Sequence, residues 1–188
     1  MLFNSLEFIV FFALVITTIV VIKNRKFQHL FLLAASYFFF IFSSNYLVSL
    51  LIFSTVLDFY IAQEIWKSTD SKKKKRLLII SIMGNLGLLG FFKYTDFGIS
   101  QFNSIAIALG QPEIPLLNII LPIGISFYTF QTLSYTIDVY RGNLEPSKSF
   151  KEFALFVAFF PQLVAGPIVR AKVFLPQLRE KMESGLGL

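Results

Sequence analysis

The sequence predicts an all-α, polytopic membrane protein with about five to six membrane helices, and two observations lead to that prediction. Of its 188 residues, 55% are apolar and only 15% are charged, whereas a soluble domain carries about 25% charged residues. The uncharged residues also form long stretches, and a helix needs about 20 predominantly apolar residues to cross a hydrocarbon core of roughly 30 Å. The length suits one domain, so we treat residues 1–188 as a single transmembrane domain.

Most expected membrane segments are stretches without Asp, Glu, Lys or Arg, and the third carries Asp58 and Glu64 towards its far end. A cluster of capping residues at 43–45 divides the longest stretch in two. Pro161 and the Gly166-Pro167 pair predict that the last segment is kinked or re-entrant. In chain order the expected segments are 8–22, 27–42, 46–66, 77–92, 101–137 with a break between 112 and 114, and 153–169.

Basic residues concentrate in two short loops, and their positions predict the orientation. Lys23, Arg25 and Lys26 follow the first segment, and residues 72–76 read KKKKR after the third. The positive-inside rule makes both loops cytoplasmic, the N-terminus extracytoplasmic and residues 93–113 an outer loop. The KKKKR run is a topology signal that attracts anionic lipid, or else a docking site for a phosphorylated ligand such as coenzyme A. No nucleic-acid partner is expected, because these charges flank membrane segments.

Few residues outside the loops are candidates for chemistry. The absence of Cys and the single histidine, His29, exclude thiolate or two-histidine metal sites, so no metal ligand is expected. Asp58 lies late in a predicted span, where an acid is a functional candidate. It is equally open to a structural role, either hydrated or paired with a basic loop. Gly84, Gly87 and Gly90 recur every three residues and predict a helix-packing face.

Polar residues gather towards the C-terminal third of the sequence. Tyr128, Gln131, Tyr135 and Asp138 are spaced as one face of a helix that begins after Pro122 and Gly124. Such a stripe must face protein or a water-filled cavity rather than lipid. Interhelical hydrogen bonding and a ligand-lined cavity explain it equally well.

Two strings in this region resemble the membrane-bound O-acyltransferase (MBOAT) family, in its bacterial alginate O-acetyltransferase branch. Residues 121–142 read LPIGISFYTFQTLSYTIDVYRG, and residues 159–170 read FFPQLVAGPIVR, followed by LPQL at 175–178. The resemblance extends through essentially the whole chain. It implies a multi-pass enzyme of the inner cell membrane that surrounds a tunnel. Such an enzyme transfers acetyl groups from cytoplasmic acetyl-CoA to hydroxyls of exopolysaccharide or other cell-envelope glycans, without a bound cofactor and often with an extracytoplasmic partner protein.

The resemblance also implies what this chain lacks. The catalytic histidine of the family lies downstream of both strings, and the context of His29 does not match it, so no catalytic residue is expected here. We therefore expect an N-terminal fragment that is inactive alone and needs a downstream segment of the family. The alternative is a non-catalytic membrane scaffold or a small transporter subunit. The candidate tunnel-lining residues are Gln131, Ser134, Asp138, Arg141, Gln162 and Arg170.

Overall fold

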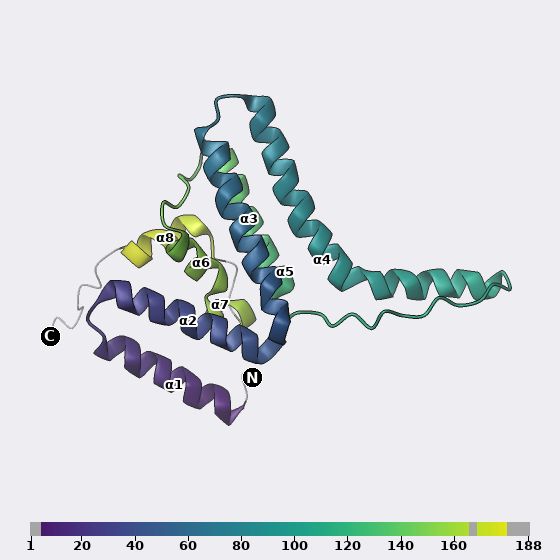
Figure 1. The fold of residues 1–188 in the computed structure, drawn as a ribbon, viewed down its shortest axis with the longest axis horizontal. Coiled ribbons are helices and arrows are strands. Elements are labelled where there is room, and N and C mark those ends of the chain that lie inside the picture. Colours follow the sequence, from purple (N-terminus) through teal and green to yellow (C-terminus); the bar gives the residue numbers. More distant parts are fainter. Residues whose placement is uncertain (1–4, 166–168, 180–188) are drawn as a thin grey trace.

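A computed structural model describes residues 5–165 and 169–179, and this part of the chain is almost entirely helical (Figure 1). It contains no strand within those ranges, which confirms the all-α prediction. In order, the elements are α1 (Leu6–Val21), α2 (Arg25–Ser44), the 3₁₀ turn η1 (Asn45–Leu47), α3 (Val48–Lys67), α4 (Ser71–Ala108), α5 (Ile125–Tyr140), α6 (Phe150–Ala158), α7 (Phe160–Ala165) and α8 (Ala171–Arg179).

Three helices, α2, α3 and α4, are long and apolar enough to cross a membrane. The apolar α1 and α5 are shorter, with 16 residues each, and would need tilting or local thinning of a bilayer. The η1 turn separates α2 from α3 at the capping cluster, where the sequence predicts a break. The chain is thus an all-α membrane protein.

The course of α4 differs from the prediction of a span over 77–92 followed by an outer loop. Asp70 caps the helix by accepting a hydrogen bond from the amide of Lys72 at 2.8 Å. The helix then continues for 38 residues and bends partway along (Figure 1). The following residues, 109–124, are not helical, so the expected helix between 114 and 137 begins only at Ile125. Pro115 and Pro122 lack a backbone donor and disfavour a helix there, and Gly124 starts α5 with φ at 75°.

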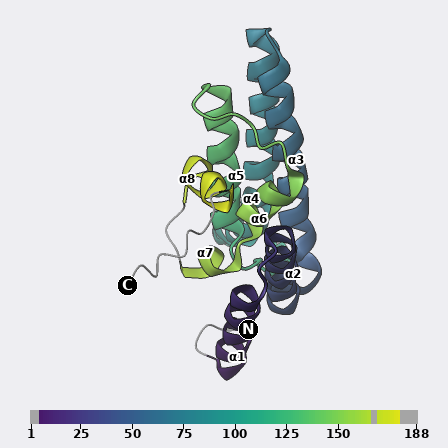
Figure 2. The ribbon, with the colours of Figure 1, turned by 90° about the vertical axis from the view of Figure 1, so that its left-hand side faces the viewer.

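The core forms where α3, α4 and α5 run side by side, and α6 packs against α2, α3 and α5 (Figures 1 and 2). All six residues from 153 to 158 in α6 are buried. Phe153 packs against Tyr135 of α5 with ring centroids 4.4 Å apart and ring planes tilted by 37°. α6 ends at Ala158 and α7 begins at Phe160, so the last segment is broken near Pro161 as predicted. The second predicted break, at Gly166-Pro167, lies outside the described residues.

A second, smaller cluster joins the N-terminal helices to the broken segment. Phe8 and Phe11 of α1 pack against Phe39 of α2 and Phe160 of α7. The amide of Phe160 also donates to the hydroxyl of Ser36 at 3.4 Å. α1 and α2 therefore lie on the side of the core that carries α7 (Figure 2).

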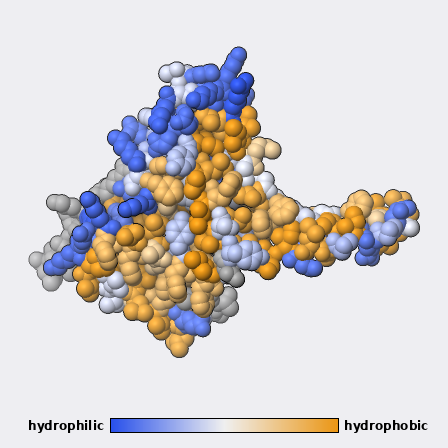
Figure 3. All heavy atoms as spheres, in the orientation of Figure 1, coloured by the Kyte–Doolittle hydropathy of each residue, from blue (hydrophilic) through white to orange (hydrophobic). Residues whose placement is uncertain are grey.

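The surface of the molecule is apolar around its middle and hydrophilic at the connection between α3 and α4 (Figure 3). Exposed apolar side chains occur on α1, α3 and α4, for example Leu14 (62%), Phe53 (49%) and Met83 (68%). Soluble monomers rarely expose apolar patches of more than a few hundred Å². The belt is the surface expected of a protein whose solvent is lipid.

Candidate functional site

Among the described residues, a fully buried polar cluster lies at the junction of α3, α4 and α5. Asp58 of α3 is fully buried, and its carboxylate accepts hydrogen bonds from the Ser81 hydroxyl and from Nδ2 of Asn85, the latter at 2.8 Å. Ser81 and Asn85 lie four residues apart on α4 and so share one face. The Thr132 hydroxyl of α5 lies 3.4 Å from Oδ1 of Asn85. One acid thus connects three helices.

The prediction for the partners of Asp58 was wrong. The sequence suggested water or a basic loop, but the described partners are neutral groups of the next helix. The second basic region instead interacts with Glu64, whose carboxylate lies 3.8 Å from Lys67 and 3.5 Å from Lys73. All three of those side chains are about half exposed or more, so these ion pairs contribute little to stability.

The geometry of the cluster favours a structural role for Asp58. An intramembrane acid is costly unless it is paired or hydrogen-bonded, and two donors from α4 satisfy the carboxylate oxygens. Ser81 and Asn85 are themselves buried. Any sliding or rotation of α4 against α3 would therefore leave buried polar groups without hydrogen-bond partners. The cluster fixes the register between the two helices.

The polar stripe of α5 faces protein, as its composition required. Nε2 of Gln131 donates to the carbonyl oxygen of Phe156 in α6 at 2.8 Å. The phenol oxygen of Tyr135 accepts from the amide of Ser147 at 3.0 Å, and Gln63 of α3 donates to the Ser147 carbonyl at 2.7 Å. Hydrogen bonding to neighbouring elements, one of the two explanations left open, therefore accounts for Gln131 and Tyr135 of the stripe.

Some polar atoms of this region remain without a partner in the described part of the chain. They are the hydroxyls of Tyr128 and Thr136, Oε1 of Gln131 and Oε1 of Gln162, all buried. Buried polar atoms are normally hydrogen-bonded, and each exception calls for an explanation. These four atoms lie on α5 and α7, the two helices that carry the motifs of the family resemblance.

The six predicted tunnel-lining residues occupy different environments. Gln131 is buried and the hydroxyl of Ser134 donates to its carbonyl oxygen at 2.8 Å, within the same helix. Asp138 and Gln162 are half-buried, and Arg141 and Arg170 are exposed at the end of α5 and just before α8. The structure does not bring all six into contact, and the two surface grooves described below are lined by other residues.

The predicted glycine face is only partly used for packing. A Cβ atom on Gly84 would lie 2.7 Å from Cδ2 of Leu57 in α3, so the two helices approach closely there. Positions 87 and 90 have nothing within 4 Å. Residues three apart are rotated by about 60° on a helix, so a run of such steps moves away from the face that contacts α3.

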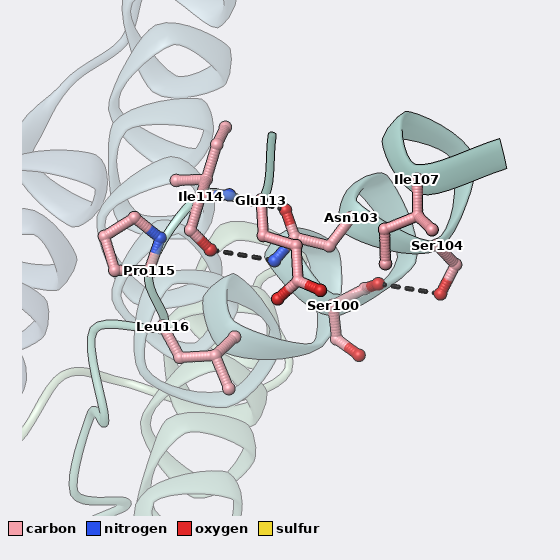
Figure 4. Close-up of a pocket in the computed structure, with 8 residues that line it drawn as sticks. All are labelled: Ser100, Asn103, Ser104, Ile107, Glu113, Ile114, Pro115 and Leu116. Atoms are coloured by element: carbon pink, nitrogen blue, oxygen red, sulfur yellow. Dashed lines mark hydrogen bonds between the residues drawn. The ribbon is translucent and has the colours of Figure 1, made fainter. Parts of the chain in front are cut away.

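Two grooves lie on the surface. One, of about 440 Å³, is apolar and lies between α1 and α2, next to Phe11, Val15 and Phe38. The other, of about 430 Å³, separates the last turns of α4 from the chain that follows (Figure 4). In that groove the side-chain amide of Asn103 donates to the carbonyl of Ile114 at 2.8 Å and accepts from its amide at 2.9 Å. Sequence reasoning missed this contact, because Asn103 lies among other polar residues, Ser100, Gln101 and Ser104, and nothing local marks it.

Comparison with known proteins gives the family context. The chain is 41% identical over 135 residues to the probable alginate O-acetylase AlgI of Pseudomonas aeruginosa, an overlap of 70% of this chain and 26% of that protein. It is 38% identical over 128 residues to the protein of the same name from Azotobacter vinelandii (68% and 26%). It is 36% identical over 156 residues to the peptidoglycan O-acetyltransferase of Helicobacter pylori (70% and 29%).

The chain therefore spans about a quarter of the length of the curated relatives it matches. No family model matches the sequence, and no solved structure matches it.

Proposed function

Because this chain is related to the membrane-bound O-acyltransferases, in the branch of the alginate O-acetylases, we propose that it forms part of a membrane O-acetyltransferase. The enzyme would transfer acetyl groups from cytoplasmic acetyl-CoA to hydroxyls of an exopolysaccharide or another cell-envelope glycan. The observation that supports this proposal is the identity of 36–41% over about 70% of the chain with proteins named for acetylation of alginate or peptidoglycan.

The chain's own contribution is a helical wall, and the reactive histidine belongs to the remaining three quarters of such an enzyme. The rigid α3–α4–α5 junction would hold this wall, and α5 and α7 would line the acyl-transfer tunnel. The buried and unpartnered polar atoms of Gln131 and Gln162 support that assignment, because a further polar surface packed on these helices would supply donors to them. Ser134, Asp138, Arg141 and Arg170 would line the same passage.

The setting follows from the same family resemblance and from the loop charges. The protein would reside in the inner membrane with its N-terminus outside, and an extracytoplasmic protein would present the glycan. The excess of Lys and Arg in the loops after α1 and after α3 supports this orientation.

The test is reconstitution from parts in cells that lack their own envelope O-acetylase. This chain, the complementary family segment, and both together would be expressed, and ester-linked acetate on the envelope glycans would be measured by mass spectrometry. Acetylation is expected only when both parts are present, because the chain lacks the family histidine. Acetylation by the chain alone would contradict the proposal, as would inactivity of both the co-expressed parts and their fusion.

A second candidate, a scaffold or small transporter subunit, has one observation in its favour, the fully buried acid Asp58. The test is solute uptake into vesicles that contain only this chain. Uptake that an Asp58→Asn substitution abolishes would favour transport, whereas uptake that survives it would exclude Asp58 as a coupling site.

A further inference from the structure

One part of the molecule has no role in the packing described so far. We call it the arm: residues 94–121, comprising the last part of α4 and the chain that returns beside it. In Figure 1 the arm extends away from α3 and α5 after the bend in α4. It is internally ordered, because the carboxylate of Asp96 accepts from the amides of Leu117 and Ile119 at 2.9 and 2.7 Å. Asn103 adds its two hydrogen bonds to Ile114.

The arm has two chemically distinct faces. Asp96, Ser100 and Asn103 recur at helical spacing, and Asp96 and Asn103 bond to the returning chain. Ser100, Asn103 and Glu113 line a groove there together with apolar side chains such as Ile107 (Figure 4). The opposite face of the helix holds Phe102 and Ile105, and Leu109 follows at its end; these three are 53%, 62% and 71% exposed. The returning chain adds two further exposed apolar side chains, Leu117 (59%) and Ile120 (66%). Such amphipathic segments lie in membrane interfaces.

The length of α4 explains why the arm cannot cross the bilayer with the rest of the helix. At 1.5 Å per residue, the helix measures about 57 Å, against roughly 30 Å of hydrocarbon. Residues 71–92 alone cover about 33 Å, starting from the basic run at 72–76, which marks one interface. The bend therefore falls near the opposite interface. No Lys or Arg occurs between Lys93 and Arg141, as expected on the side away from the basic loops.

The irregular backbone of the returning chain shows that this segment does not lie in the hydrocarbon core. Residues 109–123 form no regular secondary structure beyond a turn, and irregular backbone exposed to hydrocarbon is not tolerated. At an interface, water and head groups can satisfy those backbone groups. The apolar surface of the arm is also continuous with the apolar belt of the body (Figure 3), so the same lipid that surrounds the body reaches the arm.

We propose that the arm is an interfacial anchor that lies in the plane of the bilayer surface opposite the 72–76 run. Its partner is lipid. Phe102, Ile105 and Leu109 enter the boundary between acyl chains and head groups. The groove around Asn103 and Glu113 faces the head groups and water.

The absence of cysteine from the chain allows single-cysteine labelling. Ile105→Cys and its neighbour Ser104→Cys would each be labelled with an environment-sensitive fluorophore in the full chain, reconstituted in phosphatidylcholine–phosphatidylglycerol vesicles. Quenching of the fluorophore would be compared for lipids that carry a nitroxide at the head group, at acyl-chain carbon 5 or at acyl-chain carbon 12. Quenching by iodide would be measured with iodide on both sides of the vesicle membrane. Met83→Cys, on the exposed face of the spanning part of α4, calibrates the depth.

The label at position 105 should be quenched best by the carbon-5 lipid, and the label at position 83 by the carbon-12 lipid. Iodide should quench position 105 about fivefold less than position 104. Strongest quenching of position 105 by carbon 12 would show that the arm spans. Protection from every quencher would show that protein covers it, and equal iodide quenching at 104 and 105 would place it in water. Each of these results overturns the proposal. Phe102→Cys provides a second position if Ile105→Cys does not fold.

Discussion

Replacing Ser81 by alanine should destabilise the chain, because it removes one of the two donors that satisfy the buried carboxylate of Asp58. The matched control is Ser134→Ala, since the hydroxyl of Ser134 donates only within its own helix, to the Gln131 carbonyl. Both substitutions exchange the same residue types in a helix, so the change in helix propensity cancels in the comparison.

The expected magnitude follows from the cost of a lost interhelical hydrogen bond. Such bonds between membrane helices contribute about 0.6 kcal/mol on average and about 1.7 kcal/mol at most. Asp58 belongs at the upper end of this range, because it is fully buried and Ser81 supplies one of its two hydrogen bonds from α4. Ser81→Ala should therefore lower the free energy of unfolding by about 1.5 kcal/mol more than Ser134→Ala does.

Unfolding would be followed in detergent micelles by titration with sodium dodecyl sulfate, using far-UV circular dichroism and the fluorescence of Trp66, the single tryptophan. In an Asp58→Ala background the Ser81 substitution should have an effect of less than about 0.5 kcal/mol, because the shared bond is already absent. Equal effects of Ser81→Ala and Ser134→Ala, or an unchanged effect in the Asp58→Ala background, would refute the argument that this cluster fixes the α3–α4 register.

Three further predictions test other parts of the fold. Gln131→Leu should lower the free energy of unfolding by about 1 kcal/mol by removing the bond to α6; no change in the same detergent titration would contradict this. Asp96→Ala should speed hydrogen exchange of the arm amides that it binds by about tenfold, measured by mass spectrometry, because they lose their acceptor; the exposed Glu113→Ala serves as the control and should leave those rates unchanged. Gly87→Ala, at an open helix position, should raise the free energy of unfolding by about 0.5 kcal/mol. The free energy of unfolding of Gly84→Ala should be about 1 kcal/mol lower than that of Gly87→Ala, because the new methyl group at position 84 contacts α3. Equal thermal midpoints for the two glycine variants would show that α3 does not restrict position 84.

The elements that sequence reasoning predicted well are those set by local chemistry. The apolar stretches became α1, α2 and α3, the capping cluster became the η1 turn, and Pro161 coincided with the break between α6 and α7. The stripe from Tyr128 to Tyr135 is buried because its polar atoms exclude it from lipid. Each of these outcomes depends on residues within a few turns of one another.

The continuation of α4 beyond residue 92 was not predictable in the same way. Residues 93–108 contain Lys93, Asp96 and several small or polar side chains, a composition that suits a loop as well as a helix. Two contacts decide between them, Asp96 with residues 117 and 119 and Asn103 with residue 114. These partner residues lie beyond the end of the helix, so residues 93–108 alone do not reveal the contacts.

The sequence by itself determined that this is a membrane protein, that its helices are interrupted at the 43–45 cluster and near Pro161, and which family it resembles, because hydropathy, proline chemistry and motif identity are properties of neighbouring residues. Only the tertiary structure decided what surrounds Asp58 and where the arm goes. The acid meets Ser81 and Asn85 across 23 and 27 residues of chain, and its environment depends on how the three helices pack. In a membrane the lipid constrains which faces turn outward, but the pairing of the inward faces is set by contacts between distant residues.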